Sequence, residues 1–246
     1  LSSAPKGMFQ FEIGVQSTNE NTIKAINRKT DFKILTEAVE RLMSYKNSHV
    51  HLDLIAGLPY EDLNSFKKSF NDVYALGADV LQLGFLKLLK GTQIRREYEL
   101  HGYKFIDYPP YEFLENKYMS FSDTLYLKDI EEVFERYHNS GKFANTLKRL
   151  ESFFETPFDM FHDIAVYFRE KGYFDISVSG STLYKIMFDF ISGLGDEMIC
   201  DCLKFDWYYL YHANAAPIWN GESGFAPKKR FDIIENRRKD IFAEFG

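Results

Sequence analysis

The sequence predicts an α/β fold over its first hundred residues and an all-helical region after them. Three strand patterns alternate with helix patterns in the first part, at spacings that allow helical crossovers between parallel strands. Beyond the Pro109-Pro110 pair, only patterns of helical period recur. We therefore predict two domains, an α/β domain at residues 1–107 and an all-α carboxyl-terminal domain at residues 108–246.

The first strand is predicted within the sequence FQFEIGVQS, from Phe9 to Ser17. Strict alternation places its apolar side chains on one face and Glu12, Gly14 and Gln16 on the other. Such a strand either shows its polar face to water at the edge of a sheet or turns that face toward a ligand.

Further helices and two more strands complete the predicted α/β domain. Asp31 is a good N-cap for the second helix, and Gly77 follows the third helix as a C-cap would. The second strand, VHLDLIAG, ends at the turn Gly57-Leu58-Pro59. The predicted helices are 19–28, 31–46, 62–76 and 92–100, the further strands are 50–57 and 79–89, and the later helices are 123–138, 141–154, 157–171, 181–193, 196–212 and 227–243.

Composition and charge narrow the classes of function. The chain of 246 residues is 45% hydrophobic and 17% aromatic, which is enough for a substantial core. Its net charge of -6 argues against a dedicated nucleic-acid binder, so we interpret the basic cluster Lys228–Arg230 as a solvated helix face. No apolar run reaches the ~20 residues needed to span a bilayer, so we expect no membrane partner.

The cysteines and the first residue indicate the setting of the chain. Cys200 and Cys202 are its only cysteines, which favours a reducing, cytoplasmic location over a disulfide framework. Two positions apart on a helix, they point to different sides, so we expect core packing rather than a shared metal. The chain starts at Leu1 and not at Met, and we expect it to be cut from a longer protein.

The second strand carries several candidate site residues, because His49, His51, Asp53 and Ile55 share one face. Parallel α/β folds bind ligands at the carboxyl ends of their strands. The histidines lie near the start of the strand, which favours a structural role over the metal site of a barrel hydrolase, the alternative that we keep. Asp53 lies nearer the carboxyl end, where an inward carboxylate needs a partner such as the two hydroxyls of a ribose.

Two more candidates lie near the end of the first strand and of the helix after it. Gln16, at the carboxyl end of the strand, can donate and accept hydrogen bonds toward a ligand hydroxyl. Arg28, where the first helix stops, can form a bidentate pair with a carboxylate. Spacing alone favours a different interpretation of Arg28, as a basic residue stabilised by the helix dipole.

Four motifs follow one another in the α/β part: FEIGVQS, INR at Ile26–Arg28, LDLIAGLPYED at Leu52–Asp62 and LKGT at Leu89–Thr92. In this order they resemble the second half of the core of radical S-adenosylmethionine (radical SAM) enzymes, over about residues 8–100. The resemblance is nearest to the branch that includes oxygen-independent coproporphyrinogen oxidase and the cobalamin-binding radical enzymes. The helical part, with PPYEFL and YHNSGKF, resembles the carboxyl-terminal domain of unknown function found behind cobalamin-binding radical enzymes.

The resemblance implies a partial (β/α)6 barrel, of which this chain would supply the last three strands before the all-α domain. It implies S-adenosylmethionine as the ligand, with Gln16 at the ribose and Arg28 at the methionine carboxylate. Asp53 would take the ribose hydroxyls, and Ile55 would pack on the adenine. Glu12 lies on the same polar face as Gln16 and joins the cofactor-binding candidates. For Arg28, the resemblance favours the ligand over the helix dipole.

The resemblance also implies an activity, the reductive cleavage of S-adenosylmethionine to a 5'-deoxyadenosyl radical, in an oxidoreductase or, with cobalamin, a methyltransferase. Those enzymes hold a 4Fe-4S iron-sulfur cluster with a Cys-x-x-x-Cys-x-x-Cys motif, which this sequence lacks. Cys200 and Cys202 have the wrong spacing. We therefore expect the cluster and any cobalamin to be bound outside this chain. Alone, the chain should be inactive, with no catalytic and no metal-binding residue of its own.

Two other functions remain open from the sequence. One is a non-catalytic helical interaction module attached to a barrel remnant, and the other is the metal-dependent hydrolase with His49 and His51. For the enzyme we expect a small-molecule or peptide substrate. An incomplete barrel has an open sheet edge, so we expect the chain to self-associate there or to cover the edge with its own helices.

Overall fold

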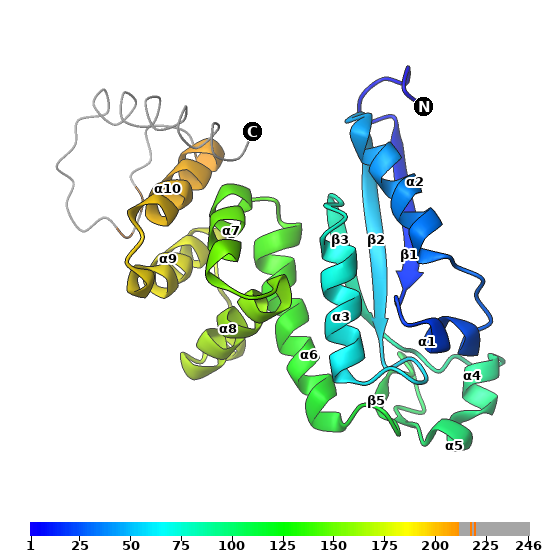
Figure 1. Ribbon diagram of the computed structural model, residues 1–246. Coiled ribbons are helices and arrows are strands. Elements are labelled where there is room, and N and C mark those ends of the chain that lie inside the picture. The colour runs from blue at the N-terminus through cyan, green and yellow to red at the C-terminus, as the bar shows by residue number, and fades with distance from the viewer. Residues whose placement is uncertain (212–216, 218, 220–246) are drawn as a thin grey trace, which may run out of the picture. The chain divides into compact units, whose positions relative to one another are not determined.

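The computed structural model describes residues 1–211, 217 and 219 (Figure 1). The predicted helix at 227–243 and the basic cluster Lys228–Arg230 lie outside the described residues.

The chain packs into two compact units, Leu1–Glu132 and a second that begins at Val133. The first unit contains the predicted α/β elements together with a small hairpin and the first part of a long helix. The division by packing thus falls later in the chain than residue 107, and the domain boundary predicted there stays a prediction.

Three parallel strands form the sheet of the first unit, in the order β1-β2-β3. Gly14 on β1 faces Asp53 on β2, which faces Gln82 on β3, so these residues form one row across the sheet. The alternation of parallel strands and helices predicted from the sequence is confirmed. The elements are β1 (Phe9–Gln16), α1 (Glu20–Ala25), α2 (Phe32–Ser44), β2 (Ser48–Ala56), α3 (Leu63–Tyr74) and β3 (Val80–Phe85).

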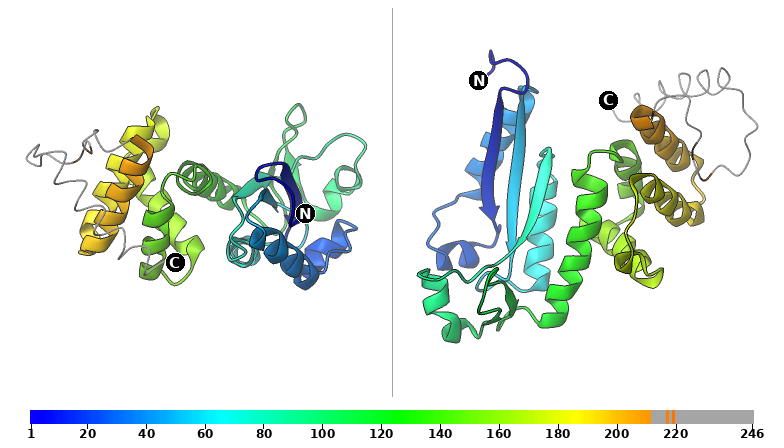
Figure 2. Two further views of the ribbon diagram at one scale, coloured as in Figure 1. Left: turned by 90° about the horizontal axis from the view of Figure 1, so that it is seen from above. Right: turned by 180° about the vertical axis from the view of Figure 1, so that it is seen from behind.

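Helices α2 and α3 pack on one face of the sheet and leave the other open, as the front view (Figure 1) and the view from behind (Figure 2) show. The covered face carries side chains with almost no exposure, among them Val50, Leu52 and Leu54 on β2 and Leu81 on β3. Their burial is the main stabilising contribution to this unit. The polar residues that alternate with them lie on the open face, as predicted.

Side-chain caps fix the starts of the first three helices. Asn19, Asp31 and Asp62 each accept hydrogen bonds from backbone N–H groups in the first turns of α1, α2 and α3. Asp31 is the N-cap that the sequence predicted. Helix α1 is shorter than predicted, since Asn27, two residues beyond it, adopts a left-handed conformation with φ 56°.

The chain after β3 differs from the prediction. Strand β3 ends at Phe85 rather than at residue 89, because the next residues pair with a small antiparallel hairpin of β4 (Lys104–Phe105) and β5 (Phe113–Glu115). The amide of Phe113 donates to the carbonyl of Leu86 at 2.9 Å. The prediction of a purely helical region from residue 108 is therefore wrong at β5, a strand too short to show a period and fixed by tertiary pairing.

The helix predicted at 92–100 is also different. It consists of two short helices, α4 (Gln93–Arg96) and α5 (Tyr98–His101), which meet at Glu97. Gly102 follows α5 in a left-handed conformation with φ 65° and ends it, as glycine commonly does at this position.

The second unit is helical throughout its described part. It begins in α6 (Phe121–Phe134) and continues through α7 (Ala144–Leu150), α8 (Pro157–Glu170), α9 (Gly180–Ile191) and α10 (Glu197–Tyr211). Its core is aromatic, with Tyr137, Phe143, Phe168 and Tyr184 fully buried. In the part of the chain that the structure describes, no helix combines the length and the hydropathy needed to cross a bilayer.

Candidate functional site

The carboxyl end of β1 carries a bulge at the position of Gln16. Gly14 pairs with Asp53 but Gln16 pairs with Leu54, so two steps on β1 match one step on β2. Gln16 has a φ of 73°, a left-handed conformation that is uncommon for residues other than glycine. Bulges and strained backbone concentrate at binding sites, which marks this end of β1 as a candidate site.

Gln16 and Arg28 lie together over Gly14. The Arg28 guanidinium donates from Nη1 to the carbonyl oxygen of Gly14 at 2.5 Å. A Cβ atom added at Gly14 would overlap the side-chain amide nitrogen of Gln16 and lie 3.4 Å from Nη2 of Arg28. Glycine thus leaves the space that both side chains occupy, and the structure brings these two predicted site residues together.

The contact with Gly14 distinguishes the two interpretations of Arg28. Helix α1 ends at Ala25, and the basic residue in its last turn is Lys24. Arg28 lies beyond the helix, and its guanidinium is bonded to β1 instead. Its charge is therefore held beside the open face of the sheet, and a role at the dipole of α1 is not supported.

Asp53 lies half-buried on the open face of β2, beside Gly14 in the register. Burial raises the pKa of its carboxyl group and the Glu12 carboxylate adds to this rise, whereas His51 and Arg28 lower the pKa. Among the described residues, no donor forms a hydrogen bond with the Asp53 side chain. A carboxylate with this burial and no hydrogen-bond donor in the described part of the chain is suited to accept hydroxyl groups of a ligand.

Glu12 and Ile55 complete the predicted set. Glu12 is exposed, lies beside His51 in the register and accepts a hydrogen bond from Gln10 at 3.2 Å. Ile55 is partly exposed and neighbours Gly84 on β3, where a glycine leaves the sheet surface free of a side chain. Both lie on the open face with Asp53, so all five predicted residues belong to one side of the sheet.

The two histidines occupy the amino end of the same face. Nδ1 of His49 lies 3.2 Å from a carboxylate oxygen of Asp79, which also accepts a hydrogen bond from the Val50 amide at 2.8 Å. The rings of His49 and His51 meet edge to face with 4.7 Å between centroids. Within the described residues, no group of three or more potential ligand side chains could hold a metal ion. His49 thus pairs with Asp79, whereas the buried Nε2 atom of His51 has no hydrogen-bond partner among the described residues. The two histidines lack, in that part of the chain, the third ligand that a hydrolase metal would need.

A cavity of about 330 Å³ opens at the carboxyl ends of the strands. Of the predicted site residues, Arg28 lines it. Asn27 donates from Nδ2 to Gln93 at 2.8 Å and Gln93 donates to Glu97 at 2.8 Å, so a chain of hydrogen bonds forms one wall. The remaining lining includes Ala25, Ile26, Leu58, Pro59, Leu86, Lys87, Thr92 and Ile94.

Sequence reasoning missed the wall formed by Asn27, Gln93 and Glu97. One signal was available for Asn27, since asparagine adopts left-handed conformations more readily than other residues with side chains. Nothing in the sequence connects Asn27 with Gln93, because 66 positions separate them.

The hairpin of β4 and β5 holds the turn that follows β2. The hydroxyl of Tyr103 and the side-chain amide of Asn116 both donate to the carbonyl of Gly57, at 2.8 and 2.9 Å. Gly57 has a φ of 89°, and a Cβ atom there would overlap the ring of Phe113. The turn that leads to Leu58 is therefore fixed by a later segment of the chain.

Comparison with known proteins assigns the family. The sequence profile of a family described as protein of unknown function (DUF4080) matches residues 99–243, more than half of the chain. The chain belongs to this family. Uncharacterized protein YtqA of Bacillus subtilis (strain 168) is 32% identical over 100 residues, which are 41% of this chain and 31% of YtqA. The chain thus spans about a third of the length of this curated relative.

The DUF4080 match begins within α5 and includes the hairpin that holds Gly57 as well as the helices after it. It agrees with the expected carboxyl-terminal domain of unknown function behind the α/β part. The family description states no function.

Proposed function

We propose that this chain is the carboxyl-terminal part of a radical SAM enzyme and carries part of its S-adenosylmethionine site. In this proposal the three strands are the last three of a partial (β/α)6 barrel, and the open face of the sheet lines the barrel interior. Two features support it. The strands are parallel and follow chain order, and β1 pairs on one side only within the described residues, which leaves an edge for an earlier strand.

The meeting of Gln16, Arg28 and Asp53 around Gly14 is the observation that carries the proposal. These residues come from two strands and a loop, yet they converge near the carboxyl end of the sheet. Their chemistry complements the ribose and the carboxylate of one ligand. Asp53 can accept hydrogen bonds from the two ribose hydroxyls, the amide of Gln16 can donate to the oxygen of one of them, and the Nη2 group of Arg28 can donate to the carboxylate.

Ile55 and Glu12 would extend this site along the open face. Ile55 offers apolar surface two residues beyond Asp53 on the same face of β2, which suits an adenine ring. Glu12 keeps a carboxylate near Asp53, where it disfavours a second negative charge. A ligand with a cationic sulfonium would therefore meet a face with two carboxylates and one guanidinium.

The iron-sulfur cluster does not fit the residues of this chain. Cys200 and Cys202 lie in α10, two positions apart with Cys202 buried, and a four-iron cluster needs more thiolates at a different spacing. When bound, the cluster and S-adenosylmethionine supply the 5'-deoxyadenosyl radical, and a cobalamin would add methyl transfer. We assign the binding of the cluster and of any cobalamin to further segments of a longer polypeptide. The residues of this chain would orient the nucleoside and the methionine carboxylate and exclude water.

Titration of the 246-residue chain with S-adenosylmethionine tests the site. Asp53→Asn and Arg28→Ala should each weaken binding by about tenfold to a hundredfold, because each removes a hydrogen bond to a charged group worth about 1.5–3 kcal/mol. Asp163→Asn on α8 and Arg41→Ala on α2 remove the same groups at exposed positions and should leave the affinity unchanged.

Equal affinities in the parent, Asp53→Asn and Arg28→Ala would contradict the site. The rival function, a helical interaction module, predicts instead a protein partner whose binding is insensitive to Asp53→Asn. In the full polypeptide with its cluster reconstituted, Asp53→Asn should also lower the rate of 5'-deoxyadenosine formation.

A further inference from the structure

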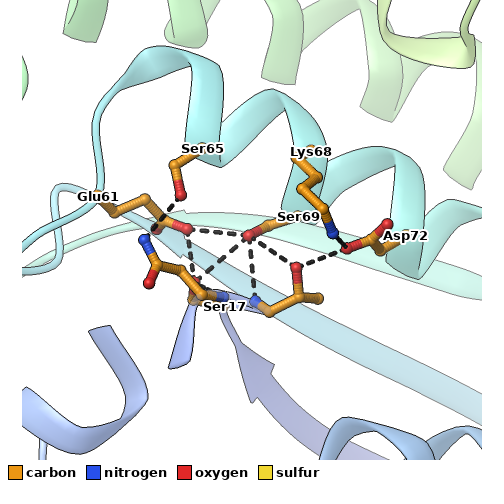
Figure 3. A network of polar contacts seen from close by, with 8 residues as sticks. Ser17, Glu61, Ser65, Lys68, Ser69 and Asp72 are labelled. Atoms are coloured by element: carbon orange, nitrogen blue, oxygen red, sulfur yellow. Dashed lines mark hydrogen bonds and ion pairs between the residues drawn. The ribbon is translucent and has the colours of Figure 1, made fainter. Parts of the chain in front are cut away.

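Glu61, in the turn after β2, is completely buried and belongs to a polar network (Figure 3). The hydroxyl of Ser17 donates to its Oε1 atom at 2.5 Å, and the hydroxyl of Ser69 on α3 donates to the same atom at 2.9 Å. The other oxygen, Oε2, is buried and has no hydrogen-bond partner among the described residues. This carboxyl group has no role in the proposed S-adenosylmethionine site.

The network continues from Ser69 to the residue after Ser17. The amide of Thr18 donates to the hydroxyl of Ser69 at 3.1 Å, and the hydroxyl of Thr18 donates to Asp72 at 2.7 Å. The same carboxylate oxygen of Asp72 lies 2.5 Å from Nζ of Lys68. Both the backbone and the side chain of Thr18 are thus hydrogen-bonded to α3.

Asn19, the N-cap of α1, is the third residue held in this way. Its side-chain amide donates to the hydroxyl of Ser65 at 2.9 Å and to the carbonyl of Tyr60 at 3.0 Å. Its backbone amide donates to the hydroxyl of Ser17 at 3.0 Å. The whole connection from β1 to α1 is therefore anchored to α3 and to the turn after β2.

Gln16 directly precedes this anchored connection. Its left-handed backbone, with φ 73°, persists only if the surroundings hold it. Ser17 is 3% exposed, and its hydroxyl meets Glu61, Ser69 and the amide of Asn19. The contacts that hold Ser17 therefore also hold the strained turn that carries Gln16 over Gly14.

We propose that Glu61 is a positioning residue, which through Ser17 holds the β1–α1 connection in the conformation that places Gln16 at the ligand site. The identity of the ligand rests on the proposed function, whereas the effect on the conformation of Gln16 does not. Glu61 acts from behind the site and needs no contact with the ligand.

The charge of Glu61 sets how firmly it holds Ser17. Burial raises the pKa of Glu61 to about 7, against the hydrogen bonds from Ser17 and Ser69, which lower it, while Asp62 adds to the rise. The neutral carboxyl group is thus favoured in the closed network, whereas an opened, solvated Glu61 has a pKa near 4.5. Opening should become easier as pH rises from about 4.5 to 7 and should then level off.

Other charged groups on the surrounding elements have contacts of their own. Lys68 and Asp72 on α3 form an ion pair, as do Glu20 and Lys24 on α1. Asp62 caps α3 by accepting a hydrogen bond from the Ser65 amide at 2.8 Å. His101 on α5 meets the ring of Tyr60 edge to face, and burial lowers the pKa of its imidazole. A change in the network between pH 5.5 and 7.5 therefore reports on Glu61 where Glu61→Gln abolishes it.

Amide hydrogen exchange of a peptide covering residues 14–23, measured in the 246-residue chain, tests directly whether Glu61 keeps the β1–α1 connection closed. After correction for intrinsic exchange, its protection in the parent should fall about tenfold between pH 5.5 and 7.5. Glu61→Gln keeps the oxygen acceptor and cannot ionise, so it should abolish this pH dependence. Glu61→Ala should lower protection at both pH values. Glu37→Gln, at an exposed position on α2, should behave as the parent does.

A binding measurement at pH 6 separates positioning from general stabilisation. Glu61→Ala should weaken binding of S-adenosylmethionine by about tenfold, and Glu61→Gln should restore the parent affinity. In a Gln16→Ala background, Glu61→Ala should have no further effect, because it acts through Gln16. Full additivity of the two substitutions would overturn the proposal.

The two measurements keep this inference apart from the proposed function. A parent chain that does not bind S-adenosylmethionine would overturn the proposed function, and the exchange measurement would then decide on Glu61. Unchanged protection of residues 14–23 in Glu61→Ala, or a parent-like pH dependence in Glu61→Gln, would overturn the role of Glu61.

Discussion

The two ends of the open sheet face each carry a carboxylate, Asp79 and Asp53, and the two differ in how they are satisfied. At the amino end, the carboxylate of Asp79 pairs with His49 and also accepts a hydrogen bond from the Val50 amide. Near the carboxyl end, Asp53 has no hydrogen-bond donor among the described residues, and Gln16 keeps a left-handed backbone. Polar groups that satisfy one another stabilise a fold, whereas open and strained groups suit a ligand. Function is therefore expected at the end where the carboxylate is unpaired and the backbone is strained.

The two ends also differ in how rigidly they are held. The amino end is tied by Asp79, which directly precedes β3. The carboxyl end is held by segments from elsewhere in the first unit. Residues at the hairpin donate hydrogen bonds to the carbonyl of Gly57, and Glu61 accepts a hydrogen bond from Ser17. A site held in place before the ligand arrives loses less entropy on binding. The extra support at the carboxyl end thus agrees with a binding role.

Gly57→Ala should have the largest effect on stability and would break the support at the carboxyl end. The new Cβ atom would sit on a left-handed backbone and would overlap the ring of Phe113, which is fully buried. We expect a loss of about 3–4 kcal/mol, the sum of backbone strain and overpacking, measured by chemical denaturation.

Gly77→Ala is the matched control for that substitution. Gly77 also has a left-handed backbone, with φ 64°, but a Cβ atom there would meet nothing within 4 Å. Only the backbone cost of about 1–2 kcal/mol should remain. Equal losses of unfolding free energy in Gly57→Ala and Gly77→Ala would show that the ring of Phe113 moves aside, and that the hairpin does not hold the turn firmly.

Local rules account for what could be predicted from the sequence. The period of two in β2 placed Asp53 and Ile55 on one face, and their burial agrees with that placement. The side chain of Asp31 was identified as a cap from its position before a periodic apolar segment, and the structure confirms it. These features depend on residues a few positions apart, which a sequence displays directly.

The features that were missed depend on distant residues. The bulge before Gln16 appears only when β1 is paired with β2, and the pairing of Ser17 with Glu61 spans 44 positions. The strand at Phe113–Glu115 exists because its backbone pairs with the segment after β3. The amide of Phe113 donates a hydrogen bond to the carbonyl of Leu86 there. No period or cap in the sequence marks such contacts, because tertiary packing creates them.

Gly14→Ala should separate binding from folding at the carboxyl end. The added Cβ atom would overlap the amide of Gln16, which is the far end of a flexible side chain and can swing away. We expect stability to change by less than about 1 kcal/mol, while the affinity for S-adenosylmethionine falls by about tenfold. Chemical denaturation measures the stability of the variant, and titration with S-adenosylmethionine measures its affinity. A large loss of stability with unchanged affinity would mean that Gln16 serves the fold and not the ligand.

His49→Gln should have the smallest effect on stability and affinity, and it tests whether the amino end of the open face takes part in ligand binding. The side chains of His49 and Asp79 are 49% and 35% exposed, and exposed pairs contribute about 0–1 kcal/mol. Glutamine can still donate to Asp79, so denaturation should show a change within that range. The affinity for S-adenosylmethionine should not change, because four residues of strand separate positions 49 and 53 by about 13 Å.

A tenfold loss of affinity in His49→Gln would extend the ligand site to the amino end and remove the contrast between the two ends. Metal analysis of the same variant gives an independent check. Stoichiometric zinc in the parent that is lost in His49→Gln would favour the hydrolase, since the pair would then be a ligand set completed by residues outside the described part. An unchanged metal content together with an unchanged affinity would leave His49 and Asp79 as a structural pair that holds the start of β2.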